Sequence, residues 1–144
     1  MTRRVQSAPT VSFEMATRLR AAGLTWNPAR FDFFHIPDRH LDDQVFVIAD
    51  LSVDVQRLAD GIAAITFNGA VEWSLDYILQ QDVVWMPTET AIRERLGSHL
   101  RSLETTGDGY RCTVDLDGES VAVDAATAAD AYAEAWLRLR AAGA

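Results

Sequence analysis

Residues 107–118, with the sequence GDGYRCTVDLDG, decide the fold class of the chain. Two Asp-Gly pairs, Asp108-Gly109 and Asp117-Gly118, enclose a segment in which apolar and polar residues alternate. A period of two is typical of a strand with one buried face. Asp-Gly pairs favour two-residue type I′ turns, in which both residues have positive φ. The segment therefore predicts a strand in an antiparallel meander.

Helices are expected on both sides of this meander. Thr88 can cap a helix over residues 88–96, and Asp124 or Thr127 can cap a second one over residues 125–141. The order helix, three strands, helix is that of a double-stranded-RNA-binding domain. The likeness stops at topology, because the segment is acidic and has no lysine.

The first half of the chain has the same kinds of signal. Thr10 can cap a helix over residues 11–22. Residues 44–49 are apolar on both faces, which is typical of a central strand. Asp60-Gly61 and Asn68-Gly69 divide residues 51–77 into three strands. We therefore predict an α+β fold, an antiparallel sheet built from two β-meanders with three helices packed on it. A flexible N-terminus, residues 1–10, should precede a single domain over residues 11–144.

Charge excludes several classes of function. The 144 residues include 13 basic side chains, all arginine, against 21 acidic ones, for a net charge of −8. Without lysine there is no P-loop lysine and no Schiff base. Both halves of the chain are equally acidic, which argues against binding of nucleic acid. The eight glycines all have structural positions, so no phosphate-cradling loop and no cofactor is expected.

The hydrophobic pattern argues against membrane insertion. The longest apolar run, Val45–Ala49, has five residues, whereas a bilayer span needs about 20. No apolar segment follows Arg3-Arg4, so a secretory signal is not expected. Cys112 is the single cysteine, so the chain can form no internal disulfide. One reduced cysteine is consistent with the reducing environment of the cytoplasm. We expect a cytoplasmic protein.

One segment carries metal-ligating side chains. His35, Asp38 and His40 lie within residues 35–43 and could supply imidazole and carboxylate ligands to zinc or manganese. Pro37 interrupts the segment, so the spacing does not fit a helical pair of ligands. A polar loop between two strands is the favoured interpretation, and a metal site is the alternative.

Two tryptophans lie at the ends of predicted elements. Trp26 precedes Asn27-Pro28, and Trp85 precedes Met86-Pro87. A tryptophan in such a place can seal the edge of a core or present an aromatic surface to a partner. Sealing is the favoured interpretation, because apolar patches on monomers are usually small, and partner binding is the alternative for which both residues are candidates.

Three stretches resemble a family of small actinobacterial proteins labelled pilus assembly protein CpaE. They are AGLTWNP at 22–28, IPDRHLDDQVFV at 36–47 and NGAVEW at 68–73, and the likeness covers roughly residues 12–140. The resemblance implies a small cytoplasmic protein. It supplies no active-site residue, because a chain without lysine cannot carry the phosphate-binding lysine of the ATPases that share the label.

The sequence predicts a non-catalytic binding or accessory protein that acts through a surface. Its expected partner is another protein, with a homodimer as a further option. The alternative function is a metal-dependent enzyme or metal-binding protein that uses the segment from His35 to Asp43. The position of that segment discriminates between the two, because ligands must converge in a concave site.

Overall fold

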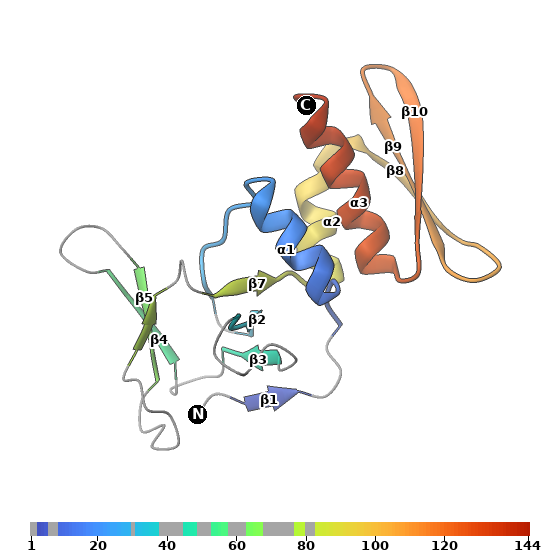
Figure 1. The fold of residues 1–144 in the computed structure, drawn as a ribbon. Coiled ribbons are helices and arrows are strands. Elements are labelled where there is room, and N and C mark those ends of the chain that lie inside the picture. The colour runs from blue at the N-terminus through green and yellow to red at the C-terminus, as the bar shows by residue number, and fades with distance from the viewer. Residues whose placement is uncertain are drawn as a thin grey trace. The chain divides into compact units, whose positions relative to one another are not determined.

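The computed structural model describes residues 3–5, 9–29, 31–37, 45–48, 53–57, 63–67, 77–79 and 83–144 (Figure 1). The chain divides into two compact units. Unit 1 contains Met1–Ala8 and Thr25–Met86, and unit 2 contains Pro9–Leu24 and Pro87–Ala144. Most of unit 1 is thus inserted between the two segments of unit 2.

Unit 2 contains the predicted helix, meander and helix. Helix α2 (Glu89–Leu96) leads through the short 3₁₀ helix η2 (Gly97–His99) into the meander, and helix α3 (Ala128–Ala141) follows the meander. The strands form an antiparallel sheet in the order β10-β9-β8. Their bounds are Leu100–Thr105 for β8, Tyr110–Leu116 for β9 and Glu119–Ala125 for β10. The predicted α+β class is confirmed.

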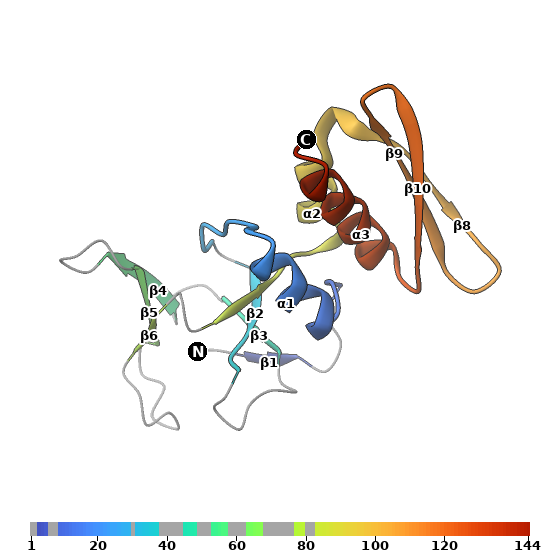
Figure 2. The same ribbon diagram turned by 45° about the horizontal axis from the view of Figure 1, so that its top comes forward.

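The core of unit 2 lies between this sheet and the helices. Helix α3 packs against β9, β10 and α2 (Figures 1 and 2). On β9, Cys112 and Val114 are fully buried, whereas Arg111, which precedes them and points to the other face of the sheet, is exposed. Alternate residues of a strand point to opposite faces of the sheet. The alternation of apolar and polar residues in the sequence therefore predicted correctly which face of β9 is buried.

The two hairpin tips differ in geometry. Asp117 and Gly118 both have positive φ, 53° and 88°, and join residues that pair directly across the turn. The prediction of a type I′ turn is correct there. Neither Asp108 nor Gly109 has a positive φ, and residues 106–109 form a four-residue connection in which the Thr106 amide donates to the Gly109 carbonyl. A two-residue type I′ turn is therefore wrong for this hairpin, although the Asp-Gly pair does lie at its tip.

Helix α1 (Phe13–Ala21) starts later than predicted. Its N-cap is Ser12, whose hydroxyl accepts from the Met15 amide, and Thr10 is not the cap. The backbone of Thr10 instead forms an antiparallel bridge with Thr88. This bridge keeps the chain extended up to Val11, so the helix can begin only beyond it.

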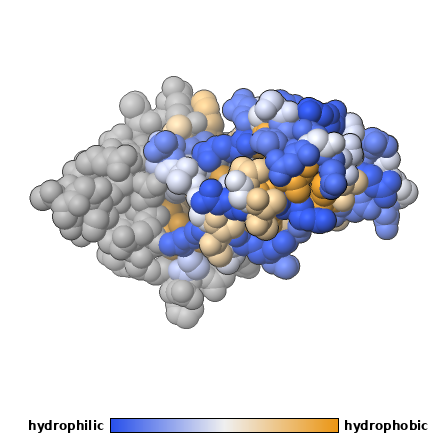
Figure 3. Space-filling model, turned by 90° about the horizontal axis from the view of Figure 1, so that it is seen from above, coloured by the Kyte–Doolittle hydropathy of each residue, from blue (hydrophilic) through white to orange (hydrophobic). Residues whose placement is uncertain are grey.

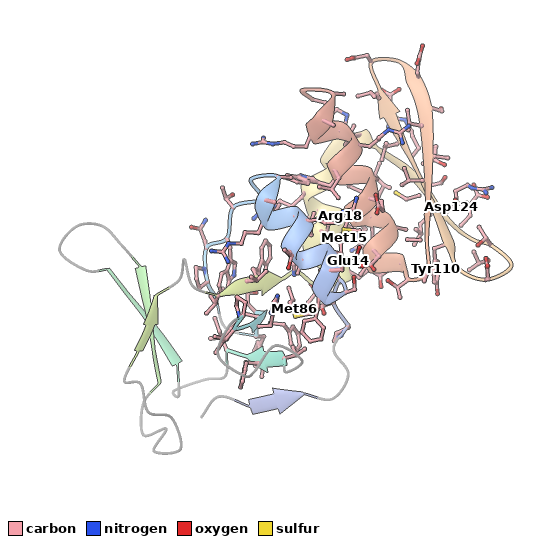
Figure 4. The ribbon with its side chains drawn as sticks, in the orientation of Figure 1. Glu14, Met15, Arg18, Met86, Tyr110 and Asp124 are labelled. Atoms are coloured by element: carbon pink, nitrogen blue, oxygen red, sulfur yellow. The ribbon has the colours of Figure 1, made fainter. Side chains whose placement is uncertain are left out.

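Helix α1 contacts α3, and its buried residues are Met15, Ala16 and Leu19. Figure 4 shows Glu14, Met15 and Arg18 along this helix. The Arg18 guanidinium pairs with Glu134 of α3, and this contact raises the pKa of the arginine. The Ser12 amide donates to the Asp130 carboxylate, 2.9 Å away. These contacts attach α1 to a helix more than a hundred residues further along the chain.

The N-caps of α2 and α3 are both threonines. Thr88 caps α2, as predicted, and its hydroxyl accepts from the Ala91 amide. Of the two candidates for α3, the cap is Thr127, whose hydroxyl accepts from the Asp130 amide. Asp124 lies on β10 and pairs with Arg111 of β9, which lowers the pKa of that carboxyl.

Unit 1 contains a four-stranded antiparallel sheet in the order β1-β3-β2-β7. Its strands are Arg3–Val5, Val45–Val47, Phe33–His35 and Val84–Met86, in that order. Strand β3 lies between two neighbours and buries Val45, Phe46 and Ile48, as predicted for a central strand. Strand β1 falls within residues 1–10, the segment expected to be flexible.

Unit 1 also contains strands of the meander predicted over residues 51–77, although residues 71–76 of its predicted third strand lie outside the described residues. Strands β4 (Val53–Arg57), β5 (Ala63–Phe67) and β6 (Tyr77–Leu79) pair antiparallel in that order. The third strand begins at Tyr77, where the prediction ended it. The turn pairs Asp60-Gly61 and Asn68-Gly69 lie outside the described residues. Within the part of the chain that the structure describes, no helix has the length and hydrophobicity to cross a membrane.

Candidate functional site

The candidate metal ligands are only partly placed. His35 is the last residue of β2, is 6% exposed, and lies between the fully buried Phe34 and Ile36. Asp38 and His40 lie outside the described residues. The described ranges hold no group of three or more His, Cys, Asp or Glu side chains that could bind a metal ion. The polar loop over residues 35–43 stays the prediction, and the metal site stays its alternative.

The two candidate tryptophans are brought together in unit 1. The indole rings of Trp26 and Trp85 are stacked, with centroids 6.1 Å apart and planes inclined by 5°. Trp85 pairs with Phe34 across β7 and β2. The ring of Phe34 lies 6.2 Å from that of Trp26 and 5.7 Å from that of Phe46. Aromatic rings thus run from the buried core to two half-exposed indoles, and such pairs contribute about 0.5–1.5 kcal/mol beyond their buried area.

Asp32 fixes the loop that carries Trp26. Its carboxylate accepts hydrogen bonds from the Trp26 indole nitrogen, at 2.8 Å, and from the Ala29 amide, at 3.0 Å. The backbone of Asp32 is held as well, since its carbonyl accepts a hydrogen bond from the Ile48 amide. The position of Trp26 is therefore set by a charged acceptor rather than by packing alone. The sequence analysis did not single out Asp32.

Phe31 is the residue of this loop that sequence reasoning missed. Its φ is +73°, a left-handed conformation that is uncommon for a bulky side chain. A hydrogen bond of 2.7 Å from its amide to the Ile48 carbonyl holds the backbone in place. The phenyl ring is 62% exposed. Left-handed backbone at such a residue costs about 1–3 kcal/mol and is found most often at binding and catalytic sites.

We give the name aromatic surface of unit 1 to the stacked pair Trp26 and Trp85 together with Phe31, which lies five residues after Trp26 in the same loop. The three residues come from one loop and from the edge strand β7 of the described sheet. Asp32 holds the loop, and the stack on Phe34 supports the indoles. The exposed phenyl ring and the two half-exposed indoles offer apolar area at the surface, and aromatic side chains of this kind are enriched at protein interfaces.

Cys112 is the one thiol of the chain and is fully buried on β9. Burial raises the pKa of this thiol to about 11, because the thiolate loses its hydration. A thiol in this state is a weak nucleophile at neutral pH. Its burial places Cys112 in the core of unit 2.

The ionisation of Cys112 should lower the stability of the protein at high pH. The unfolded thiol ionises near pH 9 and the folded one near pH 11, so the folded state keeps its proton longer. The protonated thiol therefore contributes its full stabilisation below pH 9, and this contribution is lost as the pH rises through 11. The loss lowers the free energy of unfolding by about 2–3 kcal/mol. Urea unfolding of the wild type and of Cys112→Val, at pH 8 and pH 11, measures it. Parallel pH curves for the two proteins would contradict this assignment.

Comparison with known proteins adds no relative. No protein-family model, no curated protein and no solved structure matches the chain.

Proposed function

We propose that the chain is a non-catalytic binding protein of the cytoplasm, and that a partner protein binds at the aromatic surface of unit 1. The exposed ring of Phe31, held on left-handed backbone, is the observation that carries the proposal. The resemblance noted in the sequence, to a family of small cytoplasmic proteins, is consistent with it.

The strain at Phe31 supports a binding role. A glycine or asparagine would adopt the same backbone at lower cost, yet the position holds a large apolar side chain that is mostly exposed. Burying a phenylalanine side chain against a partner contributes about 1.5–3 kcal/mol. The hydrogen bonds of Phe31 and Asp32 to Ile48 fix the loop before binding, so little conformational entropy is lost when a partner docks.

The charge of the chain favours one kind of partner. At −8 the protein attracts a basic surface and repels nucleic acid. We therefore expect a protein partner with an apolar anchor side chain surrounded by arginine or lysine. A second copy of this acidic chain is the less favoured occupant, because like charges would face each other.

The test removes the ring without disturbing the backbone. Phe31→Asn keeps a residue that tolerates left-handed φ, so the melting temperature should stay the same or rise. A photo-crosslinking residue at position 31 should capture the partner in cells, and the same residue at Ser120, exposed on β10 of unit 2, serves as the matched control.

Binding of the purified partner should then weaken at least tenfold in Phe31→Asn, measured by calorimetry. The affinity should also fall as salt is raised, because charge contributes to the encounter. Equal affinity of the wild type and Phe31→Asn, or equal crosslinking at positions 31 and 120, would overturn the proposal.

A further inference from the structure

Strand β10 is an open edge of the sheet in unit 2. In the part of the chain that the structure describes, β10 pairs with β9 alone and is the outer strand of the order β10-β9-β8 (Figures 1 and 2). Its residues take no part in the backbone hydrogen bonds that the described turns, loops and caps form. The outer side of β10 therefore carries backbone donors and acceptors that no described segment pairs.

The type I′ turn that joins β9 to β10 determines which backbone groups face outward. In a two-residue hairpin of this type, the residues that flank the turn exchange both backbone hydrogen bonds, and here these are Leu116 and Glu119. From Glu119 onward, every second residue of β10 directs its N–H and C=O groups toward β9, and the residues between direct theirs outward. The outward residues are Ser120, Ala122 and Asp124, and their side chains are exposed.

The opposite edge of the sheet, β8, has features that oppose the addition of a strand. Its register with β9 shifts between Leu100 and Ser102. The guanidinium of Arg101, which lies at this irregularity, is 3.4 Å from the Asp115 carboxylate and donates to the Ser98 carbonyl. A bulge and a charged side chain are two devices that protect an edge strand. Strand β10 contains no proline, and its register with β9 is unbroken over seven residues.

The sequence of β10, ESVAVDA over residues 119–125, is complementary to itself in the antiparallel direction. The register that pairs the whole strand with a second copy places Ala122 opposite Ala122 and Val121 opposite Val123. Both valines are half-buried, whereas Cys112, which pairs with Val123 on β9, is fully buried. A second strand beside β10 covers more of the apolar surface of the two valines, which favours association.

The charges of β10 are compatible with this register, although each chain has a net charge of −8. Asp124 already pairs with Arg111 of β9, at 2.8 Å. In the antiparallel pair it lies opposite Ser120, whose hydroxyl can donate to the carboxylate. Glu119 lies opposite Ala125. No two acidic side chains of β10 are therefore directly opposite each other, which is the arrangement that destabilises a pair of strands.

We propose that β10 is a dimerisation edge, at which a second copy of this chain binds antiparallel with Ala122 opposite Ala122. The outward backbone groups of the two copies then bond to each other, and the two sheets become one continuous sheet. The twofold axis is perpendicular to the sheet, so both copies of α3 lie on the same face. Seen from above, hydrophilic residues cover most of the described surface, with a group of hydrophobic ones among them (Figure 3). Backbone pairing suits such a surface, because it needs no broad apolar patch.

Sedimentation equilibrium of the full chain tests whether the dimer forms. We expect a weak dimer, with a dissociation constant of roughly 10–500 µM, because one edge strand buries less area than a standard interface. The average mass should rise with concentration from that of one chain toward that of two. A chain that stays monomeric up to about 1 mM would overturn the proposal.

The dependence on salt separates this dimer from binding at the aromatic surface. Raising the salt concentration should strengthen the dimer, since screening weakens the repulsion between two chains of charge −8. A basic partner at the aromatic surface should instead bind more weakly in high salt, so the two proposals fail independently. A photo-crosslink from position 120 to a second copy is distinguished by its mass from a crosslink to another protein. A dimer that weakens as salt is raised would overturn the pairing at β10.

Two proline variants locate the edge. Ala122→Pro removes an N–H group that points away from β9, so the monomer keeps its sheet, and the dimer should weaken at least tenfold. Thr105→Pro is the matched control at the exposed end of β8. Thr105 lies opposite Tyr110, whose backbone groups face β10, so its N–H also points outward. This control should change the dissociation constant less than twofold, and equal weakening in both variants would contradict the proposal.

Cysteine crosslinking tests the register and does not depend on the proline variants. A short bismaleimide should join two copies of Ala122→Cys, whose Cα atoms lie about 5.5 Å apart in the proposed dimer. Two copies of Ser120→Cys should stay separate, because the same register places their Cα atoms more than about 13 Å apart. The native Cys112 is fully buried, so the wild type serves as the blank. Equal crosslinking of the two variants, or none in Ala122→Cys, would overturn the proposal.

Discussion

Replacing Gly109 by alanine should lower the free energy of unfolding by about 3 kcal/mol, within the range for overpacked sites. A Cβ at this position would lie 2.3 Å from the Ala125 carbonyl oxygen and 3.2 Å from the carbonyl carbon. Both atoms belong to the backbone at the end of β10, where Tyr110 pairs with Ala125. The clash can be relieved only by separating β9 from β10, so no rotamer change removes it.

Gly107 in the same connection provides the control. A Cβ there meets no atom within 4 Å, and its φ is not in the left-handed region. Gly107→Ala should leave the stability unchanged or raise it by up to about 1 kcal/mol, because alanine restricts the unfolded chain. Urea unfolding followed by circular dichroism compares the two variants. Equal midpoints for Gly107→Ala and Gly109→Ala would show that the close approach of Gly109 to β10 is wrong.

Replacing Phe34 by alanine should cost about 4 kcal/mol of unfolding free energy, as large-to-small changes in a packed core do. Phe34 is fully buried on β2, and its ring stacks on Phe46 and lies beside Trp26. The change removes the ring that joins the core to the tryptophan pair. We therefore also expect a change in tryptophan fluorescence in the folded state, since the environment of Trp26 and Trp85 is altered.

Phe33→Ala is the matched control for this prediction. Phe33 precedes Phe34 on the same strand, points to the opposite face and is only half-buried. Phe33→Ala should lower the free energy of unfolding less than Phe34→Ala does, by a difference of at least about 1–2 kcal/mol, because Phe33 buries less apolar area. Denaturant unfolding of both variants measures the difference. A larger loss for Phe33→Ala would place the core of unit 1 on the wrong face of the sheet.

Local signals in the sequence predicted the elements whose geometry is set locally. Asp117-Gly118 forms the expected turn because both residues can adopt positive φ without help from neighbours. Thr88 caps its helix through a bond that is equally local, because its hydroxyl accepts from the Ala91 amide three residues further along. Gly109 shows the limit of such reasoning. Its lack of a side chain serves a close approach to Ala125, which is sixteen residues away, and no short motif indicates that contact.

Long-range pairing also decided where α1 begins. Thr10 and Ser12 are both suitable N-caps by residue type. The bridge from Thr10 to Thr88 keeps the first of them in an extended segment, so Ser12 takes the role. A prediction from neighbouring residues alone cannot choose between the two candidates, because the deciding contact comes from another part of the chain.

The candidate site was predictable only in part. Trp26 and Trp85 were identified as candidates because each lies at the end of an element, but their stacking depends on the pairing of β7 with β2. Asp32 could have been found as a carboxylate six residues after a tryptophan, although that signal is weak. The left-handed backbone of Phe31 has no signal in the sequence, because residues that favour this conformation are glycine and asparagine.

The insertion of unit 1 between the segments of unit 2 affects how the protein is made. Helix α1 is translated early, and its partners Asp130 and Glu134 of α3 are translated more than a hundred residues later. At the usual speed of a ribosome this is a delay of about 5–20 s. During that time helix α1, whose Met15 and Leu19 are buried in the finished protein, lacks its contacts with α3. A nascent chain of this design therefore exposes an apolar helix face while residues 25–86 are completed, and a chaperone near the ribosome has a defined segment to hold.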